Sequence, residues 1–424
     1  MYPKTLVLSN ECFSRNTSNG RTLGNFFLGW PKECLAQFFL SGSPDDYYCE
    51  HYFQVSDRQA LNAILGKKNC GSSVELQQEQ SKNASARPAQ KLHRNAHTML
   101  IREAVWASRF WEKSGFWQWV SEFSPDIVLL QAGDCAFMFR LALRIAKKLS
   151  AKLVIYNTEG YYFKDFDYFR ASGIAHYAYP VFRCLLRKAV QQGYRAADYA
   201  IFNCDALQDD FCREFPLKSK VIYTATDLLT EITEKELCST FVASYAGNLG
   251  VGRSRTLIDV ANCLRQISQD IRLDVYGTVP DAETQMLLNN CENICFHGSI
   301  SYEEVKQVIQ KSDLIIHVES FDPFYVEDLK YAFSTKIADA LASNRCFLMY
   351  GPDSSAEFSY LQNNSAAYVI GSQAALIETM RILVQDPEKR NKYCANALAL
   401  VKKNHDRDTS VAVFQKILCE LVHS

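Results

Sequence analysis

A lysine lies at an unusual place in the segment AFSTKIADALASNRC, residues 332–346. The pattern predicts a short helix that begins near Ser334 or Thr335, because either hydroxyl can accept a hydrogen bond from a free N–H of the first turn. Lys336 follows at once, although the N-terminal end of a helix dipole is already positive. Two explanations fit: the long side chain bends into solvent, or an anion binds at this helix start and contacts the lysine, the cap and the free N–H groups.

A glycine-rich turn with arginines beside it is the second feature that could bind an anion. Residues 245–261, YAGNLGVGRSRTLIDVA, are typical of a strand, a turn and a helix. Glycines in the turn let the backbone approach a ligand closely, and Arg253 can hold a phosphate with two parallel hydrogen bonds. The turn lacks the G-K-[ST] ending of a Walker loop and the GxGxxG spacing of a dinucleotide-binding turn. Its glycines are Gly247, Gly250 and Gly252.

Together, the two helix starts predict a single diphosphate site. Arg253 and Lys336 would both face the anion, and Asp339, one turn into the second helix, is placed to accept hydrogen bonds from ribose hydroxyls. The segments DVYG (274–277) and FHGSI (296–300) end strands in small residues. Main-chain groups of the loops there could therefore hold a nucleotide base.

Short apolar runs alternate with helical patterns along the chain, and they fall into two sets. The runs are apolar throughout, which is typical of parallel strands buried on both faces. The helical pattern over 301–312 opens with a capping box of Ser301 and Glu304, and another helix is expected over 255–268. The expected strands are 5–9, 126–131, 152–157, 199–203 and 220–223, and then 242–247, 272–277, 294–298, 313–318, 345–351 and 366–370. This alternation predicts an α/β fold of two doubly wound, Rossmann-like domains, with a ligand cleft between them.

The composition shifts suggest where the domains begin and end. We expect a first domain over residues 1–230, a second over 231–403, and a terminal helix over 404–424 that packs back on the first. A charged stretch over 227–240 would join the two sets of strands. Residues 66–97 are polar and rich in Ser, Gln, Asn and Lys, so they are expected to form a long surface loop.

The composition is that of a globular protein and argues against several classes. The 424 residues are 48% hydrophobic with a formal net charge of −1, so the basic footprint of a nucleic-acid-binding protein is missing. The 15 cysteines have no framework spacing, which predicts reduced thiols in a cytosolic protein. The close pair Cys291 and Cys295 is expected in the core rather than on a metal. No signal peptide and no apolar run of about 20 residues is visible, so no membrane span is expected.

Aromatic and basic side chains gather in two segments of the first half. Four of the five tryptophans lie within residues 102–123, where a pair of helices burying their aromatic faces is the favoured interpretation. The alternative is a surface that meets a lipid-linked acceptor or a membrane. Residues 181–195 carry several Arg and Lys side chains, for which a solvated face is the default and a membrane-facing one the alternative.

The order of these motifs resembles that of GT-B glycosyltransferases of the family-four (glycosyl transferases group one) type. GNLGVGR, LDVYG, NICFHGSISYEEV, DLIIHVESF and FSTKIADALAS are similar to the nucleotide-binding domain. SNECFSRNTSNGRTLGNFFLGWP, DIVLLQAGDCAF and VIYNTEGYYFK are similar to the acceptor domain of members that assemble bacterial polysaccharides. The resemblance covers most of the chain and is weakest over residues 60–100.

This resemblance implies an activity and a location. The expected reaction transfers a hexosyl group from a nucleotide diphosphate sugar to a glycan or lipid-linked saccharide, with retention at the anomeric carbon. No cofactor and no metal is expected, and nucleic acid is not an expected partner. The protein would act in cell-surface polysaccharide assembly, in the cytoplasm or peripherally on the inner face of the plasma membrane.

The resemblance also assigns roles to named residues. Arg253 and Lys336 would neutralise the leaving diphosphate, on which charge grows as the glycosidic bond breaks. Gly20, in the loop after the first strand, would approach the diphosphate and the sugar. The catalytic candidates are Glu159, Glu319, Arg253 and Lys336. The donor-binding candidates are Gly20, Gly247, Asn248, Arg253, Gly277, Ser299, Ile300, Ser334, Thr335, Lys336 and Asp339.

Two glutamates separated by seven residues are common in the family, and Glu319 and Glu327 match this spacing. The helix register instead assigns the second position to Asp339, because DALASNRC takes the place of the family context E-A-M-A-C-G-K-P. We therefore expect Glu327 in an elongated loop and Glu319 near the donor sugar. For Glu159, a place at the cleft and an interdomain hydrogen bond are equally good alternatives.

Three other functions compete with this one. A metal-dependent GT-A transferase needs an Asp-x-Asp after a strand, and DFD (165–167) and DRD (406–408) match only by letter. A GT-B-shaped sugar-nucleotide epimerase would bind the same donor but needs acid and base groups around the sugar. A non-catalytic nucleotide-sugar-binding protein would bind the donor without turnover.

Overall fold

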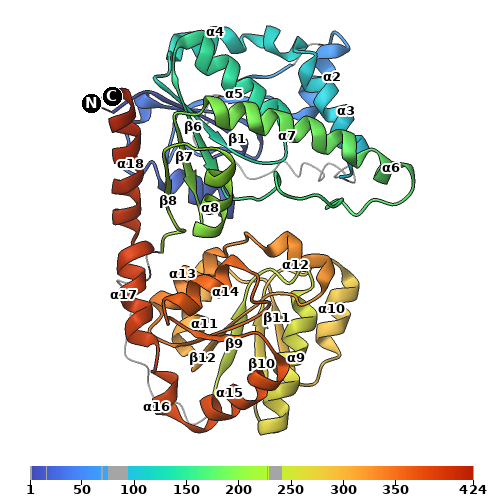
Figure 1. Cartoon of the computed structure of the whole chain (residues 1–424), viewed down its shortest axis with the longest axis vertical. Coiled ribbons are helices and arrows are strands. Elements are labelled where there is room, and N and C mark those ends of the chain that lie inside the picture. Colours follow the sequence, from blue (N-terminus) through green and yellow to red (C-terminus); the bar gives the residue numbers. More distant parts are fainter. Residues whose placement is uncertain are drawn as a thin grey trace, which may run out of the picture. The chain divides into compact units, whose positions relative to one another are not determined.

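The chain folds into two compact units (Figure 1). The computed structural model describes residues 2–15, 17–67, 70–74, 94–226, 228 and 241–423. Unit 1 comprises Met1–Ile222 and Val411–Ser424, and unit 2 comprises Tyr223–Ser410. Most of the expected joining segment 227–240 and most of the predicted loop 66–97 lie outside the described residues.

Unit 1 is built around an 8-stranded sheet in the order β4-β3-β2-β1-β5-β6-β7-β8. Neighbouring strands are parallel except at one edge, where β4 runs antiparallel to β3. The strands are β1 (Thr5–Glu11), β2 (Leu35–Ser41), β3 (His51–Gln54), β4 (Ser72–Val74), β5 (Ile127–Gln131), β6 (Lys152–Asn157), β7 (Tyr199–Phe202) and β8 (Ser219–Val221). The helices are α1 (Ser18–Asn25), η1 (Lys32–Cys34), α2 (Asp57–Ile64), α3 (Ala96–Ala107), η2 (Phe110–Ser114), α4 (Phe116–Phe123), α5 (Ala136–Leu149), α6 (Ile174–Tyr177), α7 (Tyr179–Ala196) and α8 (Asp205–Glu214).

Unit 2 is built around a 6-stranded parallel sheet in the order β11-β10-β9-β12-β13-β14. The strands are β9 (Ala243–Ala246), β10 (Leu273–Tyr276), β11 (Ile294–Gly298), β12 (Leu314–Val318), β13 (Cys346–Tyr350) and β14 (Tyr368–Ile370). The helices are α9 (Arg253–Ile267), α10 (Ala282–Asn289), α11 (Tyr302–Lys311), α12 (Pro323–Leu329), α13 (Thr335–Ala342), α14 (Ala356–Asn363), α15 (Gln373–Gln385), α16 (Pro387–Arg390) and α17 (Cys394–Asn404).

The structure confirms the prediction of two doubly wound α/β units, and every expected strand is present. The capping box of Ser301 and Glu304 at the start of α11 is present as well. The sequence prediction missed β2, β3 and β4, so the first sheet is wider than expected. Both β3 and β4 are short and carry too few apolar residues for a strand signal, and β4 lies within the polar segment predicted as a loop.

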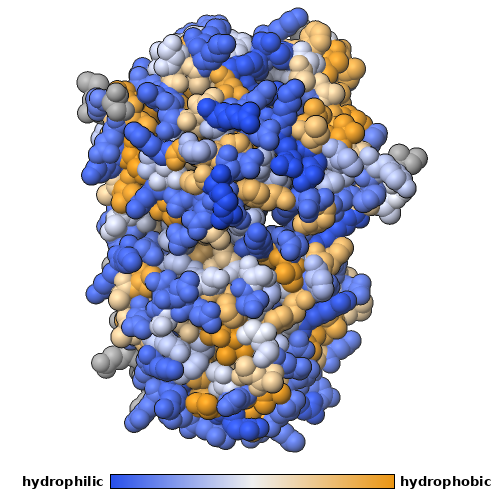
Figure 2. All heavy atoms as spheres, in the orientation of Figure 1, coloured by the Kyte–Doolittle hydropathy of each residue, from blue (hydrophilic) through white to orange (hydrophobic). Residues whose placement is uncertain are grey.

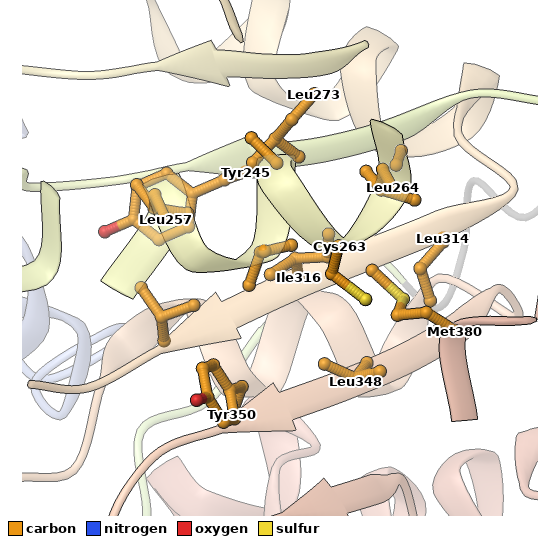
Figure 3. Packing of buried hydrophobic residues seen from close by; sticks show 14 of the residues in the cluster. Tyr245, Leu257, Cys263, Leu264, Leu273, Leu314, Ile316, Leu348, Tyr350 and Met380 are labelled. Atoms are coloured by element: carbon orange, nitrogen blue, oxygen red, sulfur yellow. The ribbon is translucent and has the colours of Figure 1, made fainter. Parts of the chain in front are cut away.

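The core of unit 2 joins its sheet to the helices that cover it. Figure 3 shows Leu257 and Leu264 of α9 beside strand residues such as Leu314 and Ile316. All four side chains are buried, and the apolar positions of α9 recur at helical spacing. This packing fixes the axis of α9, and therefore the place where Arg253 begins the helix.

The last helix, α18 (Arg407–His423), begins in unit 2 and continues as part of unit 1 from Val411 onward. Phe414 stacks on Phe26 with ring centroids 4.5 Å apart and planes 9° apart. The side-chain amide of Gln415 donates to the carbonyl oxygens of Phe26 and Leu28. The helix therefore contributes to the core of unit 1.

The tryptophan-rich segment forms helices whose aromatic rings are largely buried. Trp106 and Trp111 lie in the core, and Trp106 stacks on Phe137 of α5 with 4.4 Å between ring centroids. This confirms the core interpretation for these two side chains. No helix of the described residues combines the length and the apolar character that a membrane crossing requires.

The molecular surface is mostly hydrophilic on the face that Figure 2 shows, with apolar side chains in small patches. The 14 cysteines that the structure describes are free thiols. Cys291 packs against the core of unit 2, as the sequence predicted for its pair with Cys295.

Candidate functional site

The glycine-rich turn between β9 and α9 is shaped by close backbone contacts within unit 2. Gly252 is the N-cap of α9 with φ +77°, and Val251 before it also has a positive φ of 50°. A Cβ on Gly277 would overlap the carbonyl oxygen of Gly247, so the turn packs directly on the backbone after β10. Glycine is required at these positions by the fold of the turn itself.

Arg253, the first residue of α9, forms a two-pronged ion pair with Glu319, which follows β12. Its Nε lies 2.9 Å from Oε2 and its Nη2 lies 2.7 Å from Oε1. The glutamate is 1% exposed, so the pair is shielded from solvent. Burial alone would raise the pKa of Glu319, but hydrogen bonding to His317 and the charge of Arg253 outweigh it and lower that pKa.

His317 lies between two buried carboxylates. Its Nε2 is 2.8 Å from Oε2 of Glu357 and 3.5 Å from Oε1 of Glu319. Burial opposes a charge on the imidazole, but the two carboxylates prevail and raise the pKa of His317. The two carboxylates therefore favour the charged form of the ring.

These three side chains are also the group of described residues whose ligand atoms come close enough together to hold a metal ion. In this structure their oxygens already accept hydrogen bonds from the protein. Arg253 donates to both oxygens of Glu319, while the backbone N–H of Ser334 and the ring of His317 donate to the two oxygens of Glu357. The donor set thus suits a charge network better than a divalent cation.

Lys336 is the second residue of α13 and lies at the N-terminal end of this helix. Ser334 is the N-cap, and its hydroxyl accepts from the backbone N–H of Lys336 at 3.4 Å. The side chain of Lys336 is half-buried, with Nζ 6.0 Å from the ring centroid of Tyr245 and directed at Gly247. Burial first, and then the charge of Arg253, lower the pKa of Lys336 to about 8. The side chain therefore turns toward Tyr245 and Gly247, and the anion at this helix start stays a prediction.

Asp339, one turn further along α13, is 9% exposed and already contacts hydroxyl groups. Its Oδ1 accepts from Oγ1 of Thr226 at 2.7 Å and from the hydroxyl of Tyr302 at 3.1 Å. A cavity of about 30 Å³, lined in part by His317, Lys336 and Asp339, lies beside it. The carboxylate of Asp339 thus accepts hydrogen bonds from hydroxyl groups, which in this structure belong to the protein.

Other predicted residues of unit 2 lie around this cluster. Asn248 accepts from the N–H of Gly250 through its side chain and from the hydroxyl of Tyr245 through its carbonyl. Thr335 is the first residue of α13, and Ser299 and Ile300 follow β11 at the surface. The structure therefore brings Arg253, Glu319, Gly247 and Lys336 together.

Gly20 and Glu159 belong to unit 1. Gly20 lies in α1 and not, as the sequence had predicted, in a loop, because Thr17 caps a helix here by accepting from the N–H of Gly20. A Cβ on Gly20 would overlap the carbonyl oxygen of Cys12 and the N–H of Ser14, so packing against the preceding segment requires this glycine. Glu159 follows β6 with an exposed side chain, and its N–H donates to the side chain of Asn157.

The prediction for Glu327 was wrong in one respect. Glu327 lies in the helix α12, which Asp322 caps by accepting from the N–H of Phe324, rather than in an elongated loop. The Asp-Pro pair at its start was a helix signal, because proline suits the first turn. The side chain of Glu327 is exposed.

Sequence reasoning missed His317 and Glu357, which complete the cluster. His317 is a polar residue within an apolar strand and shares a face with Glu319, two residues on, so the period of a strand could have indicated it. Glu357 lies in the first turn of α14, a helix that Ser355 caps. An acidic residue at this position commonly stabilises the helix dipole, so its sequence context did not indicate a functional role.

Comparisons with known proteins agree with this geometry. Residues 253–415 match the family described as glycosyl transferase-like, a range that covers most of unit 2. No curated protein sequence matches the chain.

Solved structures match the fold over nearly the whole chain. The HepE protein of Anabaena in complex with UDP has a TM-score of 0.64 at 12% identity, covering 98% of this chain and 100% of its own. Sucrose-phosphate synthase from Thermosynechococcus elongatus has a TM-score of 0.62 at 12% identity, covering 98% of both chains. The lipopolysaccharide outer core galactosyltransferase WaaB has a TM-score of 0.56 at 13% identity, covering 99% of both.

The fold of the chain is therefore that of the GT-B glycosyltransferases, as the sequence motifs led us to expect. More particularly, the match to the glycosyl transferase-like family begins at Arg253, the residue paired with Glu319.

Proposed function

We propose that this protein transfers a hexosyl group from a nucleotide diphosphate sugar to a glycan or lipid-linked saccharide. The observation that carries the proposal is the meeting of Arg253 and Lys336 at two helix starts of one glycosyl transferase-like domain. Two cationic side chains beside helix N-termini form a strong anion-binding arrangement. A diphosphate is the anion that fits a domain of this type.

Charge stabilisation is the chemistry that these residues would supply. As the glycosidic bond breaks, negative charge grows on the β-phosphate oxygens, and fixed cations lower the barrier by stabilising it. A bound phosphate would stabilise the charged form of Lys336 in particular. The pKa of Lys336 is lowered to about 8 by burial and by the charge of Arg253, and a nearby anion would oppose both effects. Glu319 holds Arg253 in place for this role.

The remaining donor contacts follow from the places of the other residues. We assign the ribose hydroxyls to Asp339, whose carboxylate contacts the hydroxyls of Thr226 and Tyr302 in the present structure. Main-chain groups near Gly277, Ser299 and Ile300 would hold the base. In unit 1, Gly20 and Glu159 would approach the diphosphate and the sugar.

Uridine nucleotides are the first donors to test, since HepE was solved with UDP and with UDP-glucose. We further propose retention at the anomeric carbon, which the resemblance to the family implies. We also propose turnover without a metal, because Arg253 and Lys336 can supply the positive charge. The expected setting is cell-surface polysaccharide assembly, in the cytoplasm or at the inner face of the plasma membrane.

A donor panel tests the proposal. The protein is incubated with UDP-, GDP- and dTDP-sugars, with and without EDTA, and released nucleoside diphosphate is measured. Slow release with free unaltered sugar supports a transferase that uses water as a poor acceptor. An altered sugar would indicate an epimerase, and thermal stabilisation by a donor without any release would indicate a binding protein. Proton NMR of a glycosylated acceptor then reports the anomeric configuration.

A further inference from the structure

A basic pocket in unit 1 lies apart from the residues assigned above. It has a volume of about 710 Å³, in the range of small-molecule sites, and is bounded by the end of α3, by η2, by α4 and by the second half of α5. Because α5 begins after the carboxyl end of β5 and ends just before the amino end of β6, its second half points away from the edge of the sheet at the carboxyl ends of the strands, after which Gly20 and Glu159 lie. The lining residues are Ser108, Arg109, Phe110, Glu112, Lys113, Trp117, Arg144 and Lys148.

One carboxylate organises this pocket. Glu112 accepts from Nη2 of Arg144 at 2.6 Å, from Nε of Arg109 at 3.2 Å and from Nε1 of Trp117 at 2.7 Å. Although burial would raise the pKa of Glu112, these three donors outweigh it and lower that pKa. Glu112 therefore stays ionised and fixes the two guanidinium groups and the indole.

The two lysines of the pocket take no part in the ion pairs of Glu112. Within the described part of the chain, neither Lys113 nor Lys148 lies within ion-pair distance of a carboxylate. Lys148 Nζ is instead held 4.2 Å from the ring centroid of Trp117, and Lys113 Nζ 5.0 Å from that of Phe110. Cation–π contacts orient both ammonium groups without neutralising them.

Two further observations concern the arginines of this pocket. Nη1 of Arg144 is buried and has no hydrogen-bond partner among the described residues, and the guanidinium of this half-buried side chain lies 5.8 Å from the ring centroid of Trp117. Arg109 has a φ of 62°, a left-handed conformation that a residue with a long side chain rarely adopts. Strain of this kind gathers at ligand sites, and here it directs the Arg109 side chain toward Glu112.

We propose that this pocket binds a phosphate group. Four basic side chains and a single carboxylate line the pocket, and two of the four are arginines, which match phosphate oxygens through paired N–H donors. The volume exceeds that of phosphate alone, so the ligand carries a further group such as glycerol or a sugar. The ligand is either a soluble phosphate ester or the head group of an anionic lipid. The site is independent of nucleotide-sugar binding in unit 2.

Binding is measured by calorimetry with glycerol 1-phosphate, and by sedimentation with vesicles of phosphatidylglycerol in phosphatidylcholine against phosphatidylcholine alone. The test variant is K113Q/K148Q, which leaves the Glu112 network intact. The matched control is K147Q/K188Q, which removes two exposed lysines of unit 1 outside the pocket. Excess UDP is added to occupy the donor site.

A site for soluble esters is supported by three results together. The affinity for the soluble ester falls at least tenfold in K113Q/K148Q, it stays within twofold of the wild type in the control, and binding persists in excess UDP. The same pattern with anionic vesicles alone supports a lipid head-group site. The proposal is overturned if neither probe binds, if UDP displaces the probe, or if both double variants lose binding equally. Circular dichroism confirms that the variants are folded.

Discussion

Nη2 of Arg253 and Oε1 of Glu319 lie 2.7 Å apart in the interior of unit 2, and a second hydrogen bond of 2.9 Å closes the pair. The pair joins the first residue of α9 to the residue after β12, so it ties the glycine-rich turn to the centre of the sheet. A glutamate expected to face the donor sugar thus serves to hold the cation expected to bind the diphosphate.

Glu319→Gln should lower stability as well as activity. Removing one partner of a buried ion pair leaves Arg253 without its charge partner, at a cost of about 3–5 kcal/mol in the free energy of unfolding. Urea unfolding measures this loss. Glu327→Gln is the matched control, because that side chain is exposed and should shift the free energy by at most about 0.5 kcal/mol. Unchanged stability in Glu319→Gln would show that Glu319 does not hold the Arg253 side chain in place.

Lys336→Ala should weaken nucleoside diphosphate binding about 10- to 100-fold, since a charge-assisted hydrogen bond in a buried site is lost. Nucleoside monophosphate binding should change far less, because the lysine faces the distal phosphate in the proposed site. Calorimetry with UDP and UMP measures both affinities. Equal losses for the two ligands would argue against the phosphate role.

The affinity for nucleoside diphosphate should fall as the pH rises above about 8. The pKa of Lys336 is about 8 in the empty site, and a bound anion favours the charged lysine and raises that pKa. Binding above pH 8 therefore takes up a proton, and affinity drops by up to about tenfold per pH unit. Calorimetry between pH 7 and 9.5 in buffers of different ionisation enthalpy checks this. Lys336→Ala should lack this proton uptake.

Glu357→Gln should lower the pKa of His317. The carboxylate that lies 2.8 Å from its Nε2 favours the imidazolium, and a neutral amide does not. NMR titration of protein labelled at histidine carbons follows the ring, and His317→Gln identifies its signal. If His317 titrates at the same pH in both proteins, Glu357 does not set its charge.

His405 should make unit 2 sensitive to acid. Burial lowers the pKa of His405 to about 4, and its neutral ring donates to the carbonyl of Thr224 and accepts from the hydroxyl of Tyr360. A depressed histidine pKa means that the unfolded chain binds more protons between pH 6.5 and 4. Stability is therefore complete above about pH 6.5 and declines by about 3 kcal/mol as the pH falls to 4.

Urea unfolding at pH 4.5 and 7 compares the wild type with His405→Gln. The variant should be less stable at pH 7 and should lose less stability on acidification. His423→Gln, at an exposed position of α18, is the control and should follow the wild type. A wild-type acid response in His405→Gln would assign it to other groups.

The sequence predicted the sheet of unit 2 well because its strands are short apolar runs bounded by helical patterns. It also indicated Arg253 and Lys336, because each breaks a local rule at the start of a helix. It did not indicate the pairing of Thr226 with Asp339, which are 113 residues apart. Nor did it indicate Glu357, whose partners His317 and Ser334 come from other elements. Such contacts depend on tertiary packing, which no local pattern records.

The membership of α18 in unit 1 bears on the order in which the protein can fold during synthesis. Phe414, Leu418 and Leu421 belong to the same core as Phe26 and Trp30. The three residues of α18 leave the ribosome after the whole of unit 2, because they follow it in the sequence. The unit that is translated first is therefore the last to complete its interior, because the core positions of Phe414, Leu418 and Leu421 stay unfilled until α18 has left the ribosome.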